Sequence, residues 1–188
     1  MPLSADPFEA LVWAIVGQQV NVGFAATCRA RVVALVGVDA GAGLRAHPDA
    51  RRIAALEPDE LIPLQYSRRK AEYLVDAARA VRDGALDLDA LGDATAAEID
   101  RSLSPLRGIG PWTVRYVLMR GYGFADCVPV GDAGLVNALR RMYALAERPG
   151  PQEQERLLEP FAPHRSLAAF HLWKSLADER PPSPRRKA

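Results

Sequence analysis

The stretch between residues 103 and 121 constrains the fold of this chain more than any other. It contains the sequence Leu-Arg-Gly-Ile-Gly-Pro-Trp, in which Gly108 and Gly110 stand on either side of one apolar residue. Glycine permits tight turns and the close approach of another backbone, and Pro111 is a favourable first residue of a helix. The pattern predicts a helix, a hairpin turn, and a second helix that begins at Pro111 and ends with a left-handed cap at Gly121.

The start of that second helix is a candidate anion site. Backbone N–H groups at a helix N-terminus have no partner within the helix, and the helix dipole favours negative charge there, as on a DNA phosphate. The net charge of +1 is low for a nucleic-acid-binding protein, which usually has a basic surface. Basic residues do gather around the motif, at Arg107, Arg115, Arg120, Arg140 and Arg141.

The remaining sequence predicts an all-α fold, because apolar residues do not alternate over more than a few positions. The segment 37–48 is rich in glycine and is expected to be a loop. Helices are expected at about 7–20, 23–36, 50–56, 58–64, 68–83 and from 95 to the hairpin, with later ones starting at Asp132, near Gln152 and near Ser166.

Several classes of protein are disfavoured by the composition. No segment resembles a membrane span or a secretory signal, so we expect a cytoplasmic protein. Cys28 and Cys127 are too few for a disulfide framework or for an iron–sulfur cluster. The histidines have no spacing that indicates a zinc site.

Asp132 is a candidate catalytic residue. It follows a Val-Pro-Val-Gly loop and precedes an apolar run, which is the position of a helix N-cap. Cleavage of the bond between a base and deoxyribose develops positive charge on the sugar, and a nearby carboxylate can stabilise that charge. Most aspartate N-caps only cap a helix, so position alone leaves both roles open.

Aromatic residues favour the catalytic interpretation. Trp112 and Tyr116 are four residues apart on one helix face, and Trp173 lies in the last predicted helix. Aromatic faces stack on an extruded base and attract a cationic one, such as an alkylated purine. The alternative is that these side chains fill the core. For Trp173 considered alone, a place in the core is the favoured interpretation.

Two polar segments are weaker candidates for contact with DNA. Gln19 lies at the end of the first predicted helix, where a polar side chain is either ordinary or suited to insertion into a duplex. Ser67 and Arg68 begin another helix beside positive charge, suited either to a phosphate or to solvent.

In these residues the chain resembles the helix-hairpin-helix DNA glycosylase superfamily, and most closely its 3-methyladenine DNA glycosylase II branch. The resemblance extends over nearly the whole chain, in blocks at 6–11, 15–20, 67–74, 106–116, 128–135 and 166–173. It implies one domain over 1–179, with one lobe at 13–129 and another at 1–12 plus 130–179, and an active site in the cleft between them. Residues 180–188 are expected to form a disordered basic tail. Some members carry an additional N-terminal domain, whereas this chain begins almost at the first matching helix, so it resembles either a compact form or a truncated one.

The resemblance assigns roles to individual residues. It implies that Asp132 is the catalytic carboxylate, that Trp112, Tyr116 and Trp173 form the base pocket, and that Gln19 is the wedge inserted into DNA. DNA contacts are implied for Gly108, Gly110, Thr113, Ser67 and Arg68. Backbone carbonyls of Ser104, Leu106 and Ile109 are the implied ligands of a structural Na⁺ or K⁺, and no other cofactor is expected.

The expected activity is that of a monomeric, monofunctional DNA glycosylase acting on duplex DNA with alkylated bases. Branches that also cut the strand carry a lysine in place of Trp112, so the reaction here is expected to stop at an abasic site. A non-catalytic lesion-binding module that uses the same hairpin, and a bifunctional glycosylase and lyase, are the alternatives.

Overall fold

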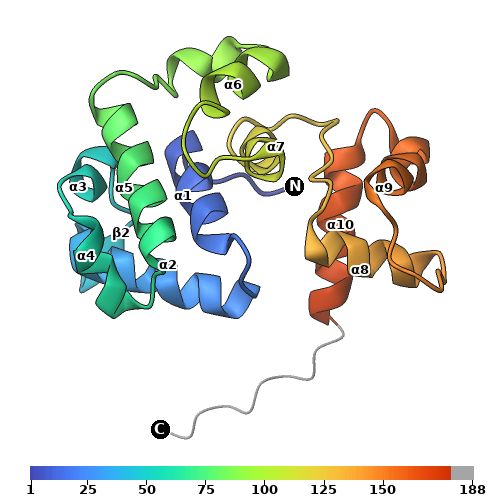
Figure 1. Ribbon diagram of the computed structural model, residues 1–188, viewed down its shortest axis with the longest axis horizontal. Helices are drawn as coiled ribbons and strands as arrows, with labels where there is room; N and C mark the ends of the chain where they lie inside the picture. The colour runs from blue at the N-terminus through green and yellow to red at the C-terminus, as the bar shows by residue number, and fades with distance from the viewer. Residues whose placement is uncertain (179–188) are drawn as a thin grey trace, which may run out of the picture. The chain divides into compact units, whose positions relative to one another are not determined.

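The computed structural model describes residues 1–178, and helices make up most of this range (Figure 1). The all-α prediction is confirmed, with a short two-stranded sheet as an addition. Contacts divide the chain into two compact units. We call Pro2–Gly123 the N-terminal unit and the chain from Phe124 onward the C-terminal unit. The expected tail, 180–188, lies outside the described residues.

The N-terminal unit is built around α1 (Pro7–Gly17), whose side chains are buried almost all round. A helix that is apolar on every side is stable only when other elements cover it. Helices α2, α5 and α7 pack against α1. The other elements of this unit are α2 (Val22–Val36), α3 (Ala50–Ala54), α4 (Pro58–Leu61), η1 (Ile62–Leu64), α5 (Arg68–Arg82), η2 (Ala90–Asp93), α6 (Ala96–Leu103) and α7 (Pro111–Arg120).

Side-chain caps confirm most of the predicted helix starts. Asp6 accepts a hydrogen bond from the Glu9 N–H at 2.7 Å, and Thr95 forms a capping box with Glu98 at the start of α6. Helix α1 ends at Gly17, three residues earlier than expected. The backbone leaves the helical conformation at Gln18, whose ψ is 128°, and Gln19 follows with a left-handed φ of 56°.

The prediction of a loop at 37–48 is wrong in its middle. Strands β1 (Val38–Gly41) and β2 (Leu44–Ala46) pair there as an antiparallel hairpin. Gly41, Ala42 and Gly43 have positive φ angles of 81°, 50° and 75°, which form the tight reversal. The strands are too short and exposed to show an alternating apolar pattern in the sequence.

Gly121 does end α7, but the predicted left-handed cap is wrong. Its φ of −91° and ψ of −47° are right-handed. A Cβ at this position would lie 3.2 Å from Ala10 Cβ and 3.3 Å from Pro7 Cα, so glycine is needed there for the close approach of α1. The left-handed glycine is Gly123, two residues later, with a φ of 76°.

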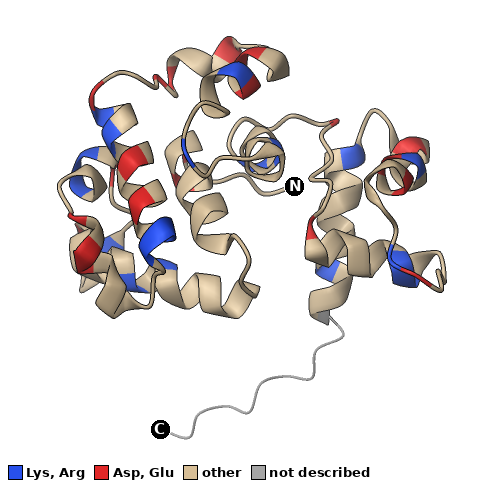
Figure 2. Cartoon of the chain, in the orientation of Figure 1, with Lys and Arg blue, Asp and Glu red and all other residues tan. Residues whose placement is uncertain are grey.

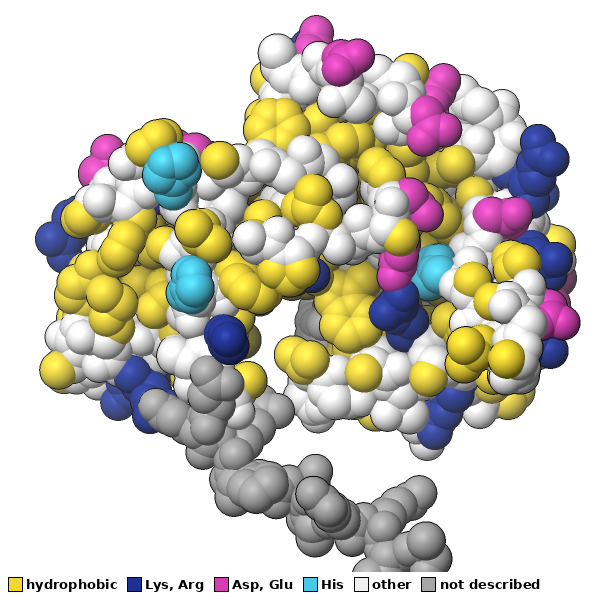
Figure 3. All heavy atoms as spheres, turned by 180° about the vertical axis from the view of Figure 1, so that it is seen from behind, with side chains coloured by type: hydrophobic (Ala, Val, Ile, Leu, Met, Phe, Trp, Pro, Cys, Tyr) yellow, Lys and Arg dark blue, Asp and Glu magenta, His cyan; other side chains and the backbone are white. Residues whose placement is uncertain are grey.

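The C-terminal unit contains α8 (Ala133–Met142), α9 (Pro151–Leu158), η3 (Glu159–Phe161) and α10 (Arg165–Asp178). Its core lies where α8 packs against α10 and α9, with Leu135, Leu139 and Leu158 fully buried. A groove of about 830 Å³ opens on this unit, and its lining is mostly apolar, with Met142 and Leu167, but also includes Arg141, His164 and His171. Hydrophobic side chains gather on this unit, on the left of Figure 3.

The division into units differs from the expected lobes in two places, because residues 2–12 belong to the N-terminal unit and residues 124–129 to the C-terminal unit. Residues 1–12 were expected to join the C-terminal half, but α1 packs along its whole length within the N-terminal unit. Its buried side chains include Phe8 and Leu11 on the first two turns. Within residues 1–178 no helix is both long and apolar enough to cross a membrane.

Candidate active site

Asp132 is the N-cap of α8, as the sequence predicted. Its Oδ1 atom accepts a hydrogen bond from the Leu135 N–H at 2.7 Å and another from the Trp173 indole Nε1–H, also at 2.7 Å. Hydrogen bonds to a carboxylate are short and about twice as strong as neutral ones. The half-buried carboxyl group is therefore fixed in direction by the start of α8 and by the middle of α10.

Gly134 makes this arrangement possible. A Cβ on Gly134 would lie 3.1 Å from Asp132 Oδ1, 3.1 Å from Trp173 Cδ1 and 3.4 Å from Trp173 Nε1. Such contacts are tighter than ordinary van der Waals contact. The indole of Trp173 reaches the carboxylate because the second residue of α8 has no side chain.

A buried glutamine holds the loop that precedes Asp132. Gly131 has a φ of 85°, and its N–H donates to Gln154 Oε1 at 2.9 Å. Gln154, on α9, is 2% exposed, and its amide Nε2 donates to the Pro149 carbonyl at 2.9 Å. The buried amide thus uses both its acceptor and its donor to fix the backbone next to the candidate catalytic residue.

The start of α10 fixes the beginning of the same loop. The buried Ser166 hydroxyl donates to the Phe124 carbonyl at 2.6 Å and accepts from the Cys127 N–H at 2.9 Å. Beside it, the Arg165 guanidinium makes two bonds to the Asp126 carboxylate, at 2.6 and 2.7 Å. This pairing lowers the pKa of Asp126 and raises that of Arg165.

The predicted hairpin lies in the N-terminal unit, between α6 and α7. Gly108 has a φ of 84°, and a Cβ there would lie 2.2 Å from Cδ2 of the Tyr73 ring on α5. Arg107, the preceding residue, pairs with Glu72 of α5 at 3.1 Å and stacks over the Tyr73 ring. Gly110 is the N-cap of α7, and no atom lies within 4 Å of the position of a Cβ there. The two glycines therefore differ: Gly108 is required for packing, and Gly110 leaves the helix N-terminus open.

Trp112 and Tyr116 form a ring pair on α7. Their ring centroids are 5.5 Å apart and their planes are inclined by 33°. Tyr116 is 7% exposed, Trp112 is half-buried, and the Arg120 guanidinium lies 6.0 Å from the centre of the Tyr116 ring. The shared face predicted from the spacing is confirmed, and contact with a base stays a prediction.

The two glutamines after α1 have different environments. Gln18 is partly buried, and its Nε2 donates to the Gly108 carbonyl at 2.9 Å and to Thr113 Oγ1 at 3.1 Å. Thr113 is 2% exposed, so its hydroxyl supports the hairpin from inside. Gln19 is exposed. The role of Thr113 in DNA binding and of Gln19 as a wedge stay predictions.

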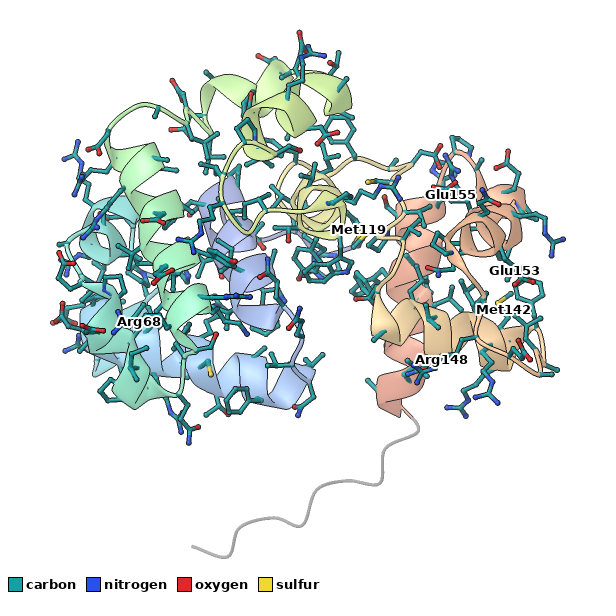
Figure 4. The ribbon with its side chains drawn as sticks, viewed as in Figure 1. Arg68, Met119, Met142, Arg148, Glu153 and Glu155 are labelled. Atoms are coloured by element: carbon teal, nitrogen blue, oxygen red, sulfur yellow. The ribbon has the colours of Figure 1, made fainter. Side chains whose placement is uncertain are left out.

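The other predicted contact residues lie at the surface. Ser67 caps α5 by accepting from the Lys70 N–H at 3.3 Å, and Arg68, labelled in Figure 4, pairs with Asp59 at 2.5 Å. Basic and acidic side chains are interspersed on the helices of the N-terminal unit (Figure 2). Any basic surface for DNA is therefore local, as the low net charge indicated.

Gln154, Ser166 and Gly134 were missed by sequence reasoning. A polar side chain on an amphipathic helix has the same sequence pattern whether it is buried or exposed, so Gln154 and Ser166 gave no signal. Gly134 did give a weak signal. Glycine is unfavourable inside a helix, so its presence in the first turn indicates that another group packs closely against it.

The fold and these sites define the chain as a member of a DNA repair family. Residues 12–163 match the model of the HhH-GPD superfamily base excision DNA repair proteins, and the chain belongs to this family. It is 36% identical to the putative DNA-3-methyladenine glycosylase YfjP of Bacillus subtilis, over 93% of this chain and 60% of the relative. It is 34% identical to DNA-3-methyladenine glycosylase 2 of Escherichia coli, over 92% of this chain and 59% of the relative. The chain thus spans about three fifths of the length of these relatives.

Solved structures of related proteins have the same fold. The Schizosaccharomyces pombe 3-methyladenine DNA glycosylase Mag1, solved in complex with abasic DNA, superposes with a TM-score of 0.81 at 24% identity, over 96% of this chain and 86% of that one. A DNA-3-methyladenine glycosidase from Bacillus halodurans superposes with a TM-score of 0.72 at 30% identity, over 95% of this chain and 81% of that one.

Proposed function

We propose that this protein is a monofunctional DNA glycosylase that removes alkylated bases of the 3-methyladenine type from duplex DNA. The observation that carries the proposal is the Asp132 carboxylate, whose Oδ1 is held by the Leu135 N–H and the Trp173 indole. The names of the relatives from Bacillus subtilis and Escherichia coli support the same activity and substrate class.

The chemistry follows from the charge that base loss creates. The bond between the base and the sugar C1′ breaks, its electron pair leaves with the base, and positive charge develops on the sugar. A carboxylate that is already oriented stabilises this charge without reorganising. Water then adds to C1′ and loses a proton, so the products are a free base and an abasic site.

The aromatic pair on α7 supports an alkylated base as the substrate. Trp112 and Tyr116 offer adjoining ring faces, and the negative face of an aromatic ring attracts a cationic base more strongly than a neutral one. A base with an added alkyl group on a ring nitrogen carries such a charge. A normal base is neutral and would gain less from the same contact.

The tryptophan at position 112 supports hydrolysis without strand cleavage. Position 112 is tryptophan, and the chain has lysines at 70, 174 and 187. Lys70 donates to two backbone carbonyls, at 2.8 and 2.9 Å, which occupies its ammonium. A lyase needs an amine that can form a Schiff base with the sugar, so we expect borohydride to trap no covalent complex with DNA.

Binding of DNA would use the hairpin turn, the start of α5 and the residue Gln19 after α1. We assign the phosphate contacts to the turn at Gly108 and Gly110 and to the α5 N-terminus at Ser67 and Arg68, and the wedge to Gln19. Carbonyls of Ser104, Leu106 and Ile109 would hold a Na⁺ or K⁺ that neutralises a phosphate. The Leu106 carbonyl accepts from the Ile109 N–H at 3.1 Å and retains a second lone pair for an ion. We further propose that the protein acts as a monomer in the cytoplasm.

A release assay tests the proposal. Purified protein is incubated with duplexes that carry alkylated, deaminated or oxidised bases, and the freed bases are measured by chromatography. We expect release of 3-methyladenine or a closely related alkylated base. Tight binding of lesion duplexes without release from any of them would instead indicate a non-catalytic lesion-binding module.

The hydrogen bond between Trp173 and Asp132 gives a separate prediction. Trp173→Phe keeps an aromatic ring but removes the Nε1–H donor, so Oδ1 of the carboxylate loses its hydrogen bond from Trp173. Hydrogen bonds to charged groups contribute about 1.5–3 kcal/mol, so we expect single-turnover base release to slow by roughly ten- to a hundredfold. Trp13→Phe in α1 is the matched control, and its release rate is expected to be unchanged. Full activity of Trp173→Phe would show that the indole does not position Asp132.

A further inference from the structure

Lys70 occupies an unusual place for an ammonium group. It lies in the first turn of α5, yet its side chain reaches the end of α1, where Nζ donates to the Val16 carbonyl at 2.8 Å and to the Gln18 carbonyl at 2.9 Å. The carbonyl end of a helix is the negative end of its dipole. Lys70 therefore satisfies the end of α1 and the first residues of the segment that follows it.

The segment held by Lys70 also contacts the hairpin. The carbonyl of Gln18 accepts from Lys70, and the side chain of the same residue donates to the Gly108 carbonyl and the Thr113 hydroxyl. Helix α5 also contacts the hairpin directly, where the Tyr73 ring packs on Gly108. The end of α1, the hairpin turn and α5 are thus joined in a closed set of contacts within the N-terminal unit.

Gln19 lies between residues that are held by these contacts, but its own side chain is exposed. Its neighbours on both sides are held, since Gln18 is bonded as described and the Val20 N–H donates to the Gly17 carbonyl at 3.5 Å. Gln19 itself is exposed and has a left-handed φ of 56°. For a residue other than glycine this conformation costs on the order of 1 kcal/mol, and it persists only where surrounding contacts impose it.

We propose that Lys70 is a positioning residue that holds the exposed Gln19 side chain at a fixed place relative to the phosphate-binding hairpin. This inference rests on the proposed function, in which Gln19 enters the duplex while the hairpin holds the backbone. A wedge is effective only if it reaches the base stack while the hairpin holds the DNA backbone. Its position relative to the hairpin must therefore be accurate, because misplacement by about 1 Å is costly.

The cost of burying the Lys70 ammonium indicates that it does more than fill space. Burial disfavours the charged form and lowers the pKa of Lys70. An apolar side chain of similar length would avoid that cost, but it would leave the carbonyls of Val16 and Gln18 without this donor. The charged group is therefore suited to fixing these carbonyls, and hence the backbone conformation that presents Gln19.

Binding selectivity tests the proposal. The probe is a duplex with a tetrahydrofuran abasic-site analogue, compared at fixed salt with the undamaged duplex, and affinity is measured by fluorescence anisotropy. We expect Lys70→Met to reduce the preference for the abasic analogue about tenfold, within the usual range for coupled contacts. Lys70→Arg, which restores a charged donor, is expected to recover most of the preference.

A double-mutant cycle separates positioning from general stability. If Lys70 acts through the wedge, Lys70→Met in a Gln19→Ala background has little further effect on selectivity. Gln18→Leu breaks the same set of contacts at the hairpin end, is expected to give the same selective loss, and serves as the test if Lys70→Met does not fold. The control Arg52→Met removes a charge from the exposed surface of α3 and is expected to change nothing.

Each outcome is decisive. Equal losses for both duplexes, or effects of Lys70→Met and Gln19→Ala that simply add, would overturn the role of Lys70 while leaving the glycosylase proposal intact. A wild-type protein that does not prefer the abasic analogue at all would overturn the wedge role of Gln19, and the inference with it, whereas the release assay tests the glycosylase proposal separately.

Discussion

Replacing Asp132 by asparagine is expected to nearly abolish base release while leaving the protein folded. The variant removes the negative charge, which is the part of the side chain that stabilises the sugar cation. Loss of one electrostatic stabiliser in an active site commonly slows catalysis by roughly two to three orders of magnitude. Single-turnover release of an alkylated base from a labelled duplex measures the effect.

The same substitution preserves the structural role of Asp132. Asparagine caps helices about as well as aspartate, and its side-chain oxygen can still accept from the Leu135 N–H and from Trp173. We therefore expect the free energy of unfolding to change by about 1 kcal/mol or less, and affinity for lesion DNA to be largely retained.

A matched control is available elsewhere in the chain. Asp49 caps α3 in the same way, accepting from the Arg52 N–H at 2.9 Å. Asp49→Asn is expected to leave base release unchanged. Undiminished turnover in Asp132→Asn would show that Asp132 only caps α8.

Gly108→Ala is expected to be the most destabilising small substitution in the hairpin. Alanine would have to adopt a φ of 84°, and its Cβ would overlap the Tyr73 ring at 2.2 Å. Left-handed strain and overpacking each cost roughly 1–3 kcal/mol, so we expect a total on the order of 3 kcal/mol. Urea denaturation measures the loss, and binding of undamaged duplex DNA is expected to weaken because the turn is displaced.

The second glycine of the hairpin provides the control. Gly110→Ala places a Cβ where no atom lies within 4 Å, at an ordinary φ of −105°, and is expected to cost about 1 kcal/mol or less. Gly108→Ala should also cost less in a Tyr73→Ala background, because only the backbone strain remains. Equal destabilisation by the two glycine substitutions would contradict the assigned difference between them.

Local sequence signals predicted the elements of the fold well. Asp6, Ser67, Thr95 and Asp132 cap helices where expected, because a cap is a contact between residues three apart and is visible in the sequence. The hairpin at Gly108 and Gly110 was predictable for the same reason.

Errors arose where distant residues decide the conformation. The end of α1 depends on Lys70, more than fifty residues away, since its ammonium holds the segment that turns at Gln19. Position 121 needs glycine because α1 approaches it closely, and no local sequence pattern indicates that contact.

The sequence by itself determined the helical class, the hairpin and the candidate residues Asp132, Trp112 and Tyr116, because each depends on spacing along one segment. Only the tertiary structure decided how Asp132 is held, since Trp173 is forty-one positions away and reaches it across Gly134. It also decided that Gln18 is bound within the unit while Gln19 is exposed. Two identical neighbouring side chains have the same chemistry, so only the packing around them gives them different roles.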